Sequence, residues 1–583
     1  MNLFAHFQQT LLNELTNLQK TGELSSDVSF DRVAVEPPRD ASHGDVATNA
    51  AMVLAKPAGM KPRDLAEKLA ALMGSWSEVA SVEVAGPGFI NMTLTQDFWI
   101  SQVAAILKQG RGYGDSTIGG QTKINVEYVS ANPTGPLHIA HARGAVIGDA
   151  LANLLAKAGY DVTKEYYIND AGSQIDTLAR SAYLRYREAF GEEISIPEGF
   201  YPGEYLIDVG QALKKEFGDR WLHANDEESW LPTIRDFASD AMVDKIKEDL
   251  AQLDIVQIFS SEKALVKSGA VGRAFKMMDD KGVMYRGTLE PPKGKTPEDW
   301  EPREQWLFKA TDFGDDVDRP VQKSDGSWTY FANDVAYHFD KHERGFVEMV
   351  DIFGVDHGGY VKRMKAAVQA MTEKKGSLDI LLCNLVKLTR GGEQVKMSKR
   401  SGNFITLREV VDEVGKDIVR FLMLTRKPDA PLDFDLDLVI QSSPDNPVWY
   451  LHYANARIEA LFKMTRDLLP DLEINDKELL NANLELLGES EELNLVKQLT
   501  AWPRVVESSA KAREPHRIAF YLNDVSAAFQ RWYSTGNRNA ALRVVVQGDK
   551  DLTKARLALA GATAHVIASG LAIMGVEPLK EMR

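Results

Sequence analysis

The sequence predicts a multidomain α/β protein: an α+β N-terminal part, a central doubly wound parallel sheet with insertions, and an all-helical C-terminal part. A strand–loop–helix–strand unit over residues 123–168 and a strand–loop–helix over residues 349–371 indicate the parallel sheet. Beyond residue 425 the apolar residues recur almost only at helical intervals. We therefore expect three domains, over residues 1–115, 116–425 and 426–583.

The central unit begins with a short apolar, β-branched run at residues 124–129, which is typical of a buried parallel strand. Two prolines within residues 132–136 exclude regular structure there. Apolar residues then recur at helical spacing up to Gly159, a residue suited to the end of a helix. Residues 162–168 form the second strand, so we expect a βαβ unit.

Two histidines, His138 and His141, lie where this loop enters the helix, three residues apart and therefore on one helical face. A helix N-terminus and imidazole N–H groups both bind phosphate oxygens. A pair of this kind alone is more often the cap of a surface helix. Zinc is a further alternative, but no other Cys or His cluster nearby supplies more ligands.

A second polar segment, KMSKR, occupies Lys396, Met397, Ser398, Lys399 and Arg400 between glycines. Three cations in five residues usually form a solvated loop. A mobile lysine loop can also close on pyrophosphate as its negative charge develops and then open for release.

Net charge, cysteine content and the length of apolar runs indicate which classes of protein this chain can belong to. The net charge of −16 argues against non-specific binding of nucleic acid without excluding a local basic face. Residues 501–583 carry 12 Lys/Arg and 7 Asp/Glu, a balance of 12 − 7 = +5, and are the expected RNA-facing surface. Cys383 is the only cysteine, which excludes a disulfide and a four-thiolate zinc site and fits a reducing cytoplasm. We expect no secretory signal and no apolar run that approaches a membrane span.

Together, HIAH (residues 138–141) after a strand and KMSK (residues 396–399) far downstream resemble the two signatures of class I aminoacyl-tRNA synthetases. Ala140 stands where the family usually has glycine. The segments DASHGDVATNAAMVLAK (residues 40–56), AGPGFINMTL (85–94), EYYINDAGSQI (165–175) and GLAIMGVEPLKEM near the C-terminus resemble arginyl-tRNA synthetases in particular. The resemblance covers essentially the whole chain.

The resemblance implies a Rossmann-like catalytic core, an additional N-terminal domain that contacts the outer corner of tRNA, and a helical anticodon-binding domain. It implies ATP-dependent activation of L-arginine and transfer to tRNA(Arg), with Mg²⁺ bound together with ATP and no zinc. Members of this family are mostly cytoplasmic monomers that need bound tRNA to activate arginine, and the resemblance implies the same here.

The resemblance also implies roles for particular residues. The catalytic ones are His138, His141, Lys396 and Lys399. Those that bind ATP are Pro133, Gly135, His138, His141, Gly354, Asp356, His357, Lys396, Met397, Ser398 and Lys399. Those that bind arginine are Glu127, Ser130, Asn132, Tyr330 and Asp334. Those that contact tRNA are Tyr450, Tyr453, Arg457 and Arg538.

Physical chemistry supports parts of this assignment. A guanidinium needs forked carboxylate or carbonyl acceptors. Glu127 ends the first strand and is expected to point into the same crevice as the histidines, and Tyr330 and Asp334 share one face if residues 330–334 are helical. An Asp356–His357 catalytic diad is disfavoured because no Ser or Cys nucleophile lies in a matching turn.

Several alternatives stay open. The chain is also compatible with a class I synthetase for another amino acid, with a catalytically silent tRNA-binding relative, or with another nucleotidyl transferase of the same fold. Asp40, His43, Asp45 and Asn49 are compatible with a polar site, although turn and cap chemistry is favoured.

Overall fold

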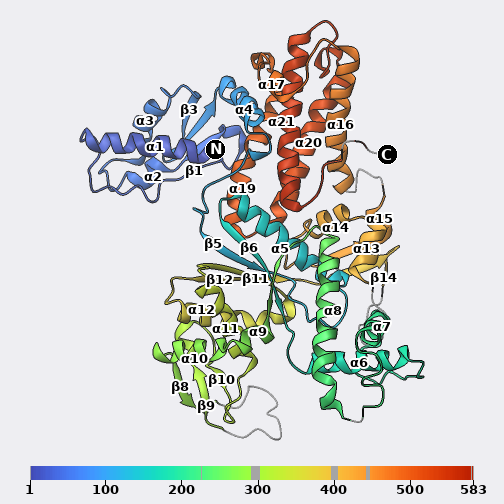
Figure 1. Ribbon diagram of the computed structural model, residues 1–583. Helices are drawn as coiled ribbons and strands as arrows, with labels where there is room; N and C mark the ends of the chain where they lie inside the picture. Colours follow the sequence, from blue (N-terminus) through green and yellow to red (C-terminus); the bar gives the residue numbers. More distant parts are fainter. Residues whose placement is uncertain are drawn as a thin grey trace. The chain divides into compact units, whose positions relative to one another are not determined.

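A computed structural model describes residues 2–224, 226–289, 303–395, 405–441, 447–579 and 581 (Figure 1). The chain forms two compact units. One comprises residues 117–442 together with 574–576, and the other comprises residues 1–116, 443–573 and 577–583. Lys396, Met397, Ser398 and Lys399 of the predicted lysine loop lie outside the described residues.

The first unit is built on a five-stranded sheet in which every neighbouring pair is parallel. Its order is β12-β11-β5-β6-β7, so the strand order reverses between β5 and β11. This is the doubly wound arrangement, whose ligands bind beyond the carboxyl ends of the strands at the reversal. The strands are β5 (Lys123–Glu127), β6 (Asp161–Ile168), β7 (Ile258–Ser261), β11 (Glu348–Gly354) and β12 (Ser377–Cys383).

The predicted βαβ unit is confirmed as β5, α5 (Ile139–Lys157) and β6. Helix α5 approaches the loop after β5 closely at Gly148, where an added Cβ would lie 2.2 Å from Cγ of Tyr128. Glycine at this position lets the helix and the loop meet without a clash, which places the start of α5 beside the end of β5.

Two groups of elements extend from the sheet. Helices α6 (Ser173–Ala189), α7 (Tyr205–Phe217) and α8 (Leu231–Ala251) pack around an aromatic core that includes Tyr186, Trp221 and Trp230. The second group shares an apolar core and consists of α9 (Glu262–Lys267), α10 (Ala270–Asp280), α11 (Tyr330–Glu343), α12 (Val361–Met371) and the antiparallel strands β8 (Met284–Gly287), β9 (Gln305–Phe308) and β10 (Arg319–Gln322). Helix α11 begins at Tyr330, so the predicted helical spacing of Tyr330 and Asp334 is confirmed.

The remaining elements of this unit are β13 (Val386–Arg390), β14 (Glu393–Gln394), α13 (Leu407–Val414), α14 (Lys416–Met423), β15 (Leu432–Asp435) and α15 (Leu436–Val439). Arg420 of α14 is fully buried. Its guanidinium donates to Asp149 of α5 at 2.5 Å, to the carbonyl of Leu253 at 2.5 Å and to the carbonyl of Met574 at 2.7 Å. Gly575 has φ +66°, and a Cβ there would lie 2.1 Å from this guanidinium. Residues 574–576 are therefore an integral part of this unit.

The second unit contains an antiparallel sheet of order β1-β2-β4-β3 with its helices: α1 (Leu3–Lys20), β1 (Val35–Glu36), β2 (Val46–Thr48), α2 (Ala50–Leu54), α3 (Pro62–Met73), β3 (Val79–Ala85), β4 (Phe89–Leu94) and α4 (Gln96–Gln109). Side chains of the polar loop accept backbone hydrogen bonds, with Asn49 accepting from Ala34 at 2.8 Å and Asp45 from Leu94 at 2.9 Å. The interpretation as turn and cap chemistry is confirmed for these two residues.

The same unit contains the C-terminal helices α16 (Pro447–Leu468), α17 (Asp476–Leu479), α18 (Ser490–Thr500), α19 (Trp502–Ala512), α20 (His516–Arg538) and α21 (Lys550–Met574), the last of which ends inside the first unit. Helices α16, α20 and α21 run side by side (Figure 1). In the described part of the chain, one helix, α21, is long and apolar enough to cross a membrane, so the expectation of no such run is wrong. However, 83% of its most apolar window is buried within the protein, as in a core helix.

We predict that Gly148→Ala destabilises the protein by about 1–3 kcal/mol, because the new methyl group must displace Tyr128 or the helix. The matched control is Gly144→Ala in the same helix, where a Cβ meets nothing within 4 Å and helix propensity favours alanine by about 1 kcal/mol. Urea titration followed by circular dichroism measures both. Equal stability of the two variants would contradict the close approach.

Candidate active site

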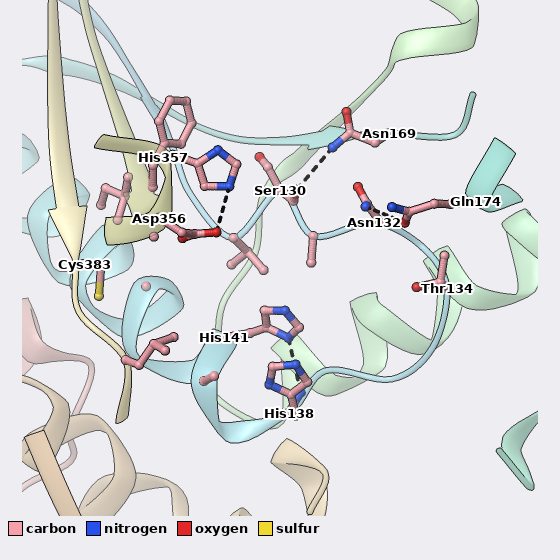
Figure 2. A pocket seen from close by; sticks show the side chains of 18 of the residues that line it. Ser130, Asn132, Thr134, His138, His141, Asn169, Gln174, Asp356, His357 and Cys383 are labelled. Atoms are coloured by element: carbon pink, nitrogen blue, oxygen red, sulfur yellow. Dashed lines mark hydrogen bonds and ion pairs between the residues drawn. The ribbon is translucent and has the colours of Figure 1, made fainter. Parts of the chain in front are cut away.

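Two adjoining cavities lie at the carboxyl ends of β5, β6 and β11, where the strand order reverses. Their volumes are about 720 and 470 Å³. The loop residues Ser130 and Asn132, Asn169 after β6, and Gly354 at the end of β11 line both cavities. The two cavities are therefore neighbouring compartments of one site, and Figure 2 shows residues that line the larger one.

The loop after β5 enters this site through unusual backbone geometry. Val129 and Ser130 have φ values of +73° and +40°, a region that side chains other than glycine rarely adopt. The Ser130 hydroxyl donates to Glu127 at 2.9 Å and accepts from the backbone N–H of Tyr167 at 3.0 Å. The hydroxyl of Tyr166 donates to the carbonyl of Ala131 at 2.8 Å. Ser130 and Ala131 are thus tied to β5 and β6, and these bonds stabilise the strained turn.

The two histidines lie on the wall of the larger cavity (Figure 2). His138 is the N-cap of α5 and His141 is in its first turn. Their rings stack with centroids 3.8 Å apart, and Nδ1 of His141 accepts from the backbone N–H of His138 at 3.3 Å. The structure therefore brings both imidazoles and a helix N-terminus to one polar compartment, an arrangement that suits an anionic ligand.

The opposite wall of the larger cavity comes from the end of β11 and the following turn, Val355–Tyr360. Asp356 and His357 line it, with Nε2 of His357 3.5 Å from a carboxylate oxygen of Asp356, and both side chains are mostly exposed. Cys383, at the end of β12, also lines this cavity, but burial raises the pKa of its thiol to about 11. A neutral thiol is a poor nucleophile, so the structure provides no thiolate partner for an Asp–His diad.

Two predicted ATP ligands do not line either cavity. Pro133 and Gly135 are buried within the loop, and a Cβ on Gly135 would lie 2.9 Å from the hydroxyl of Tyr205. The same hydroxyl donates to the carbonyl of Thr134 at 2.8 Å. Pro133 and Gly135 therefore belong to the part of the loop that packs against α7, and the neighbouring residues Asn132 and Thr134 line the larger cavity.

The smaller cavity is acidic. Glu127, Glu262 and Asp334 line it, together with Tyr330 at its rim, which is 81% exposed. No Lys or Arg of the described chain lines this cavity. Glu127 lines this compartment and the two histidines line the neighbouring one, so they share the crevice at the carboxyl ends of the strands without sharing a wall.

The electrostatics of these carboxylates favour a cationic ligand. Burial raises the pKa of Asp334 to about 6, although a hydrogen bond from the Tyr360 hydroxyl opposes the shift. Burial also raises the pKa of Glu262, which accepts from the amide of Asn333 at 2.9 Å. Carboxylates whose charged forms are destabilised by burial gain most from a cation placed between them.

Several residues of the site escaped the analysis of the sequence. Glu262 follows β7, and Asn169 and Gln174 follow β6, so each stands just beyond the carboxyl end of a strand in the sheet. The amide of Asn132 donates to Gln174 at 2.8 Å. Their position after a strand is the signal in the sequence that could have identified them.

A third cavity, of about 670 Å³, lies between α16 and α20. The guanidinium of Arg457 stacks between the rings of Tyr453 and Tyr533, 4.2 and 4.4 Å from their centroids, and donates to Gln530. All of these except Gln530 line the cavity, whereas Tyr450 does not, and Arg538 is exposed at the end of α20. The guanidinium of Arg457 therefore packs between α16 and α20 at the wall of this cavity, and its contact with tRNA stays a prediction.

Three family models match the chain. The model of the arginyl tRNA synthetase N terminal domain matches residues 5–94, that of the tRNA synthetases class I (R) catalytic domain matches residues 102–205, and that of the DALR anticodon binding domain matches residues 451–582.

The arginine–tRNA ligase of Ruegeria pomeroyi is 56% identical over 584 residues, and that of Parvibaculum lavamentivorans is 55% identical over 585 residues, each alignment covering 100% of both chains. The structure of the Thermus thermophilus arginyl-tRNA synthetase aligns over 100% of both chains with a TM-score of 0.73 at 18% identity, which confirms the predicted fold. With more than half of its residues shared with such ligases from end to end, the chain belongs to the arginyl-tRNA synthetase family of class I aminoacyl-tRNA synthetases.

Proposed function

We propose that this protein joins L-arginine to tRNA(Arg) at the expense of ATP, in keeping with the arginine–tRNA ligases to which it is similar. The observation that carries the proposal is the acidic compartment beside a histidine-lined one at the reversal of the sheet. The acidic compartment suits a guanidinium, and the histidine-lined compartment suits the phosphates of a nucleotide.

The reaction has two steps. The carboxylate of arginine attacks the α-phosphate of ATP and expels diphosphate, which gives arginyl-adenylate. The terminal adenosine hydroxyl of the tRNA then attacks the activated carbonyl and releases AMP. The protein positions the reactants and neutralises charge, and no covalent intermediate on the protein is required.

Each compartment has its own task in this scheme. Asp334, Glu262 and Tyr330 bind the guanidinium, and Ser130 and Asn132 hold the end of arginine that reacts. His138 and His141 hold phosphate oxygens, and Gly354 and the turn at Asp356–His357 face the adenosine. We propose that Lys396 and Lys399 neutralise the departing diphosphate, with Met397 and Ser398 beside the nucleotide.

Magnesium enters this proposal as a companion of ATP. Among the described residues no group of three or more His, Cys, Asp or Glu side chains is placed to hold a metal ion. Mg²⁺ commonly retains water and phosphate oxygens as most of its ligands and needs only one or two carboxylates, and Asp356 is an exposed carboxylate on the wall of the larger cavity. The ion would neutralise charge on the β- and γ-phosphates.

For the tRNA, we propose that residues 1–115 contact its outer corner and that residues 426–583 bind the anticodon. Tyr450 is the stacking candidate, Tyr453, whose ring stacks with Trp449 and Arg457, is a further anticodon contact, and Arg457 and Arg538 are the phosphate ligands. The matches to the N-terminal and DALR anticodon binding models support this division. We further propose a cytoplasmic monomer whose first step requires bound tRNA.

The test is arginine-dependent exchange of labelled pyrophosphate into ATP, with and without tRNA(Arg), alongside a panel of other amino acids. Exchange with arginine alone among the amino acids, and only in the presence of tRNA, is the expected result. Exchange with a different amino acid would overturn the assignment of the acidic cavity. Exchange without tRNA would remove the tRNA requirement, and no exchange would indicate a silent tRNA-binding protein.

We predict that Asp334→Asn and Glu262→Gln each raise the KM for arginine by on the order of tenfold to a hundredfold, because a charge-assisted hydrogen bond contributes about 1.5–3 kcal/mol. The matched control is Asp340→Asn on the same helix, whose carboxylate pairs with Arg344 at 2.9 Å and lines neither cavity. Steady-state exchange kinetics measure all three. An arginine KM in Asp340→Asn equal to that of the other two would count against the acidic pocket.

The raised pKa of Asp334 predicts a pH dependence of arginine binding. Above its pKa of about 6 the side chain is ionised and attracts the guanidinium, and below it the attraction fades. The dissociation constant for arginine should therefore rise towards tenfold per pH unit below pH 6, and Asp334→Asn should flatten this limb. Isothermal titration between pH 5 and 8 with tRNA present, at constant ionic strength, measures it. An unchanged limb in the variant would assign the titration to another group.

A further inference from the structure

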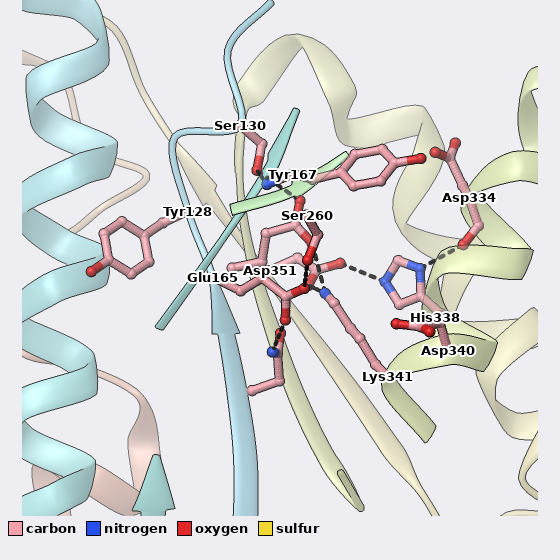
Figure 3. Close-up of polar contacts among 12 residues, drawn as sticks. Tyr128, Ser130, Glu165, Tyr167, Ser260, Asp334, His338, Asp340, Lys341 and Asp351 are labelled. Atoms are coloured by element: carbon pink, nitrogen blue, oxygen red, sulfur yellow. Dashed lines mark hydrogen bonds and ion pairs between the residues drawn. The ribbon is translucent and has the colours of Figure 1, made fainter. Parts of the chain in front are cut away.

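A buried group of charged side chains adjoins the arginine compartment, and two of its members, Glu127 and His338, line that cavity. Figure 3 shows the contacts of Lys341, His338 and Asp351 within this group. Lys341 of α11 has no exposed surface and donates to Glu127 of β5 at 2.6 Å and to Asp351 of β11 at 3.0 Å. His338, one turn before Lys341, is 3% exposed and contacts the other oxygen of Asp351 at 2.8 Å. These contacts join β5 and β11, the two strands at the reversal of the sheet, to α11, the helix that carries Asp334.

The geometry around His338 constrains its protonation. Nδ1 lies 2.8 Å from the backbone carbonyl of Asp334, and because a carbonyl only accepts, Nδ1 carries a hydrogen. Nε2 faces an oxygen of Asp351, whose second oxygen already accepts from the ammonium of Lys341. The ammonium favours the ionised carboxylate, so Nε2 also carries a hydrogen. Both ring nitrogens are donors, and the ring is an imidazolium.

The charges within this buried group balance when His338 is protonated. Two buried carboxyl groups, Glu127 and Asp351, face the single ammonium of Lys341. Burial raises the pKa of Glu127 and Lys341 opposes that shift, and both Glu127 oxygens accept hydrogen bonds, one from Lys341 and one from Ser130, which favours the ionised form. The imidazolium supplies the missing positive charge, so the buried group is neutral overall. Next to it, Arg344 pairs with the buried Glu165 at 2.9 Å and with the partly exposed Asp340 at 2.9 Å, so the buried Glu165 also has a cationic partner. The net negative charge of the arginine compartment is then left to Asp334 and Glu262.

We propose that His338 is a positioning residue for arginine: held as an imidazolium between the Asp334 carbonyl and Asp351, it neutralises the buried carboxylates and keeps Asp334 ionised for the guanidinium. This inference rests on the proposed function of the cavity. It assigns to His338 and Asp351 a role in substrate affinity through charge.

The surroundings of His338 agree with this role. The carboxylates of Asp351 and Glu127 raise the pKa of His338 against the effects of burial and of Lys341, and the positive charge of His338 lowers the pKa of Asp334. On its own helix His338 also meets Tyr337, whose ring centroid is 5.6 Å away and which stacks on Tyr167 of β6 at 4.0 Å. Both tyrosines stay neutral because burial raises the pKa of each well above its usual range.

Two neutral substitutions separate charge from hydrogen bonding. In His338→Asn the amide can still donate to the carbonyl of Asp334, and in His338→Gln it can still reach Asp351. Both remove the positive charge. We expect the pH midpoint of arginine binding to rise by on the order of one pH unit in both variants, because an unpaired buried carboxylate then faces Asp334. At pH 6 this corresponds to arginine binding weakened several-fold, up to about tenfold.

The double variant His338→Gln/Asp351→Asn removes one charge of each sign and restores neutrality. Although the double variant carries one more substitution, its pH midpoint should return to within a few tenths of a unit of the wild-type value. A purely structural role predicts a double variant that is no better than the single one. Unshifted midpoints in both single variants, or no return in the double variant, would overturn the proposal.

A measurement on the wild-type protein covers the case in which the variants do not fold. In ¹⁵N-histidine-labelled protein at pH 8, we expect one imidazole with two protonated nitrogens, because solvent-exposed histidines are neutral there. A spectrum with only neutral histidines would overturn the inference. This readout needs no arginine, so wild-type protein that fails to bind arginine would refute the proposed function separately from the state of His338.

Discussion

The pairing of Lys341 with Glu127 and Asp351 is the interaction on which the site depends. An ammonium without exposed surface is tolerated only where carboxylates compensate it, and here they come from the two strands between which the sheet reverses. One side chain thus fixes the spacing of β5, β11 and α11. Within this frame, Glu127 of β5 accepts a hydrogen bond from the Ser130 hydroxyl and so positions Ser130, and α11 carries Asp334. With the His338 imidazolium that we propose, this frame adjoins an acidic cavity without adding to its charge.

The sequence was sufficient to predict the framework of the site because the framework follows from periodicity and chain breakers. The βαβ unit, the histidines at the start of α5, the helix that begins at Tyr330 and the turn after β11 all obey local rules. Glu262 obeys the same rule of strand ends, but its strand is four residues long and half-exposed, which leaves no apolar run to detect. Lys341 and His338 look like surface residues of an amphipathic helix, and only the tertiary packing buries them.

Other differences also have physical causes. Pro133 and Gly135 face α7, a partner that is distant in sequence, so a local interpretation could not assign their orientation. Arg457 lies among aromatic residues, as RNA ligands often do, and in the structure its guanidinium packs against Tyr453 and Tyr533 and donates to Gln530. The apolar character of α21 reflects its place inside a helical bundle and not a lipid environment. In each case the neighbour that decides the outcome lies far along the chain.

The burial of Arg420 against the carbonyl of Met574 has a consequence for the order in which the chain can fold. Arg420 and Met574 belong to the same compact unit, but residues 443–573 between them in the sequence belong to the other unit. Domains otherwise tend to fold as units. Until residues 574–576 join the nucleotide-binding unit, Arg420 lacks one acceptor for its buried guanidinium, which is costly. The folding of this unit therefore cannot be completed from residues 117–442 alone.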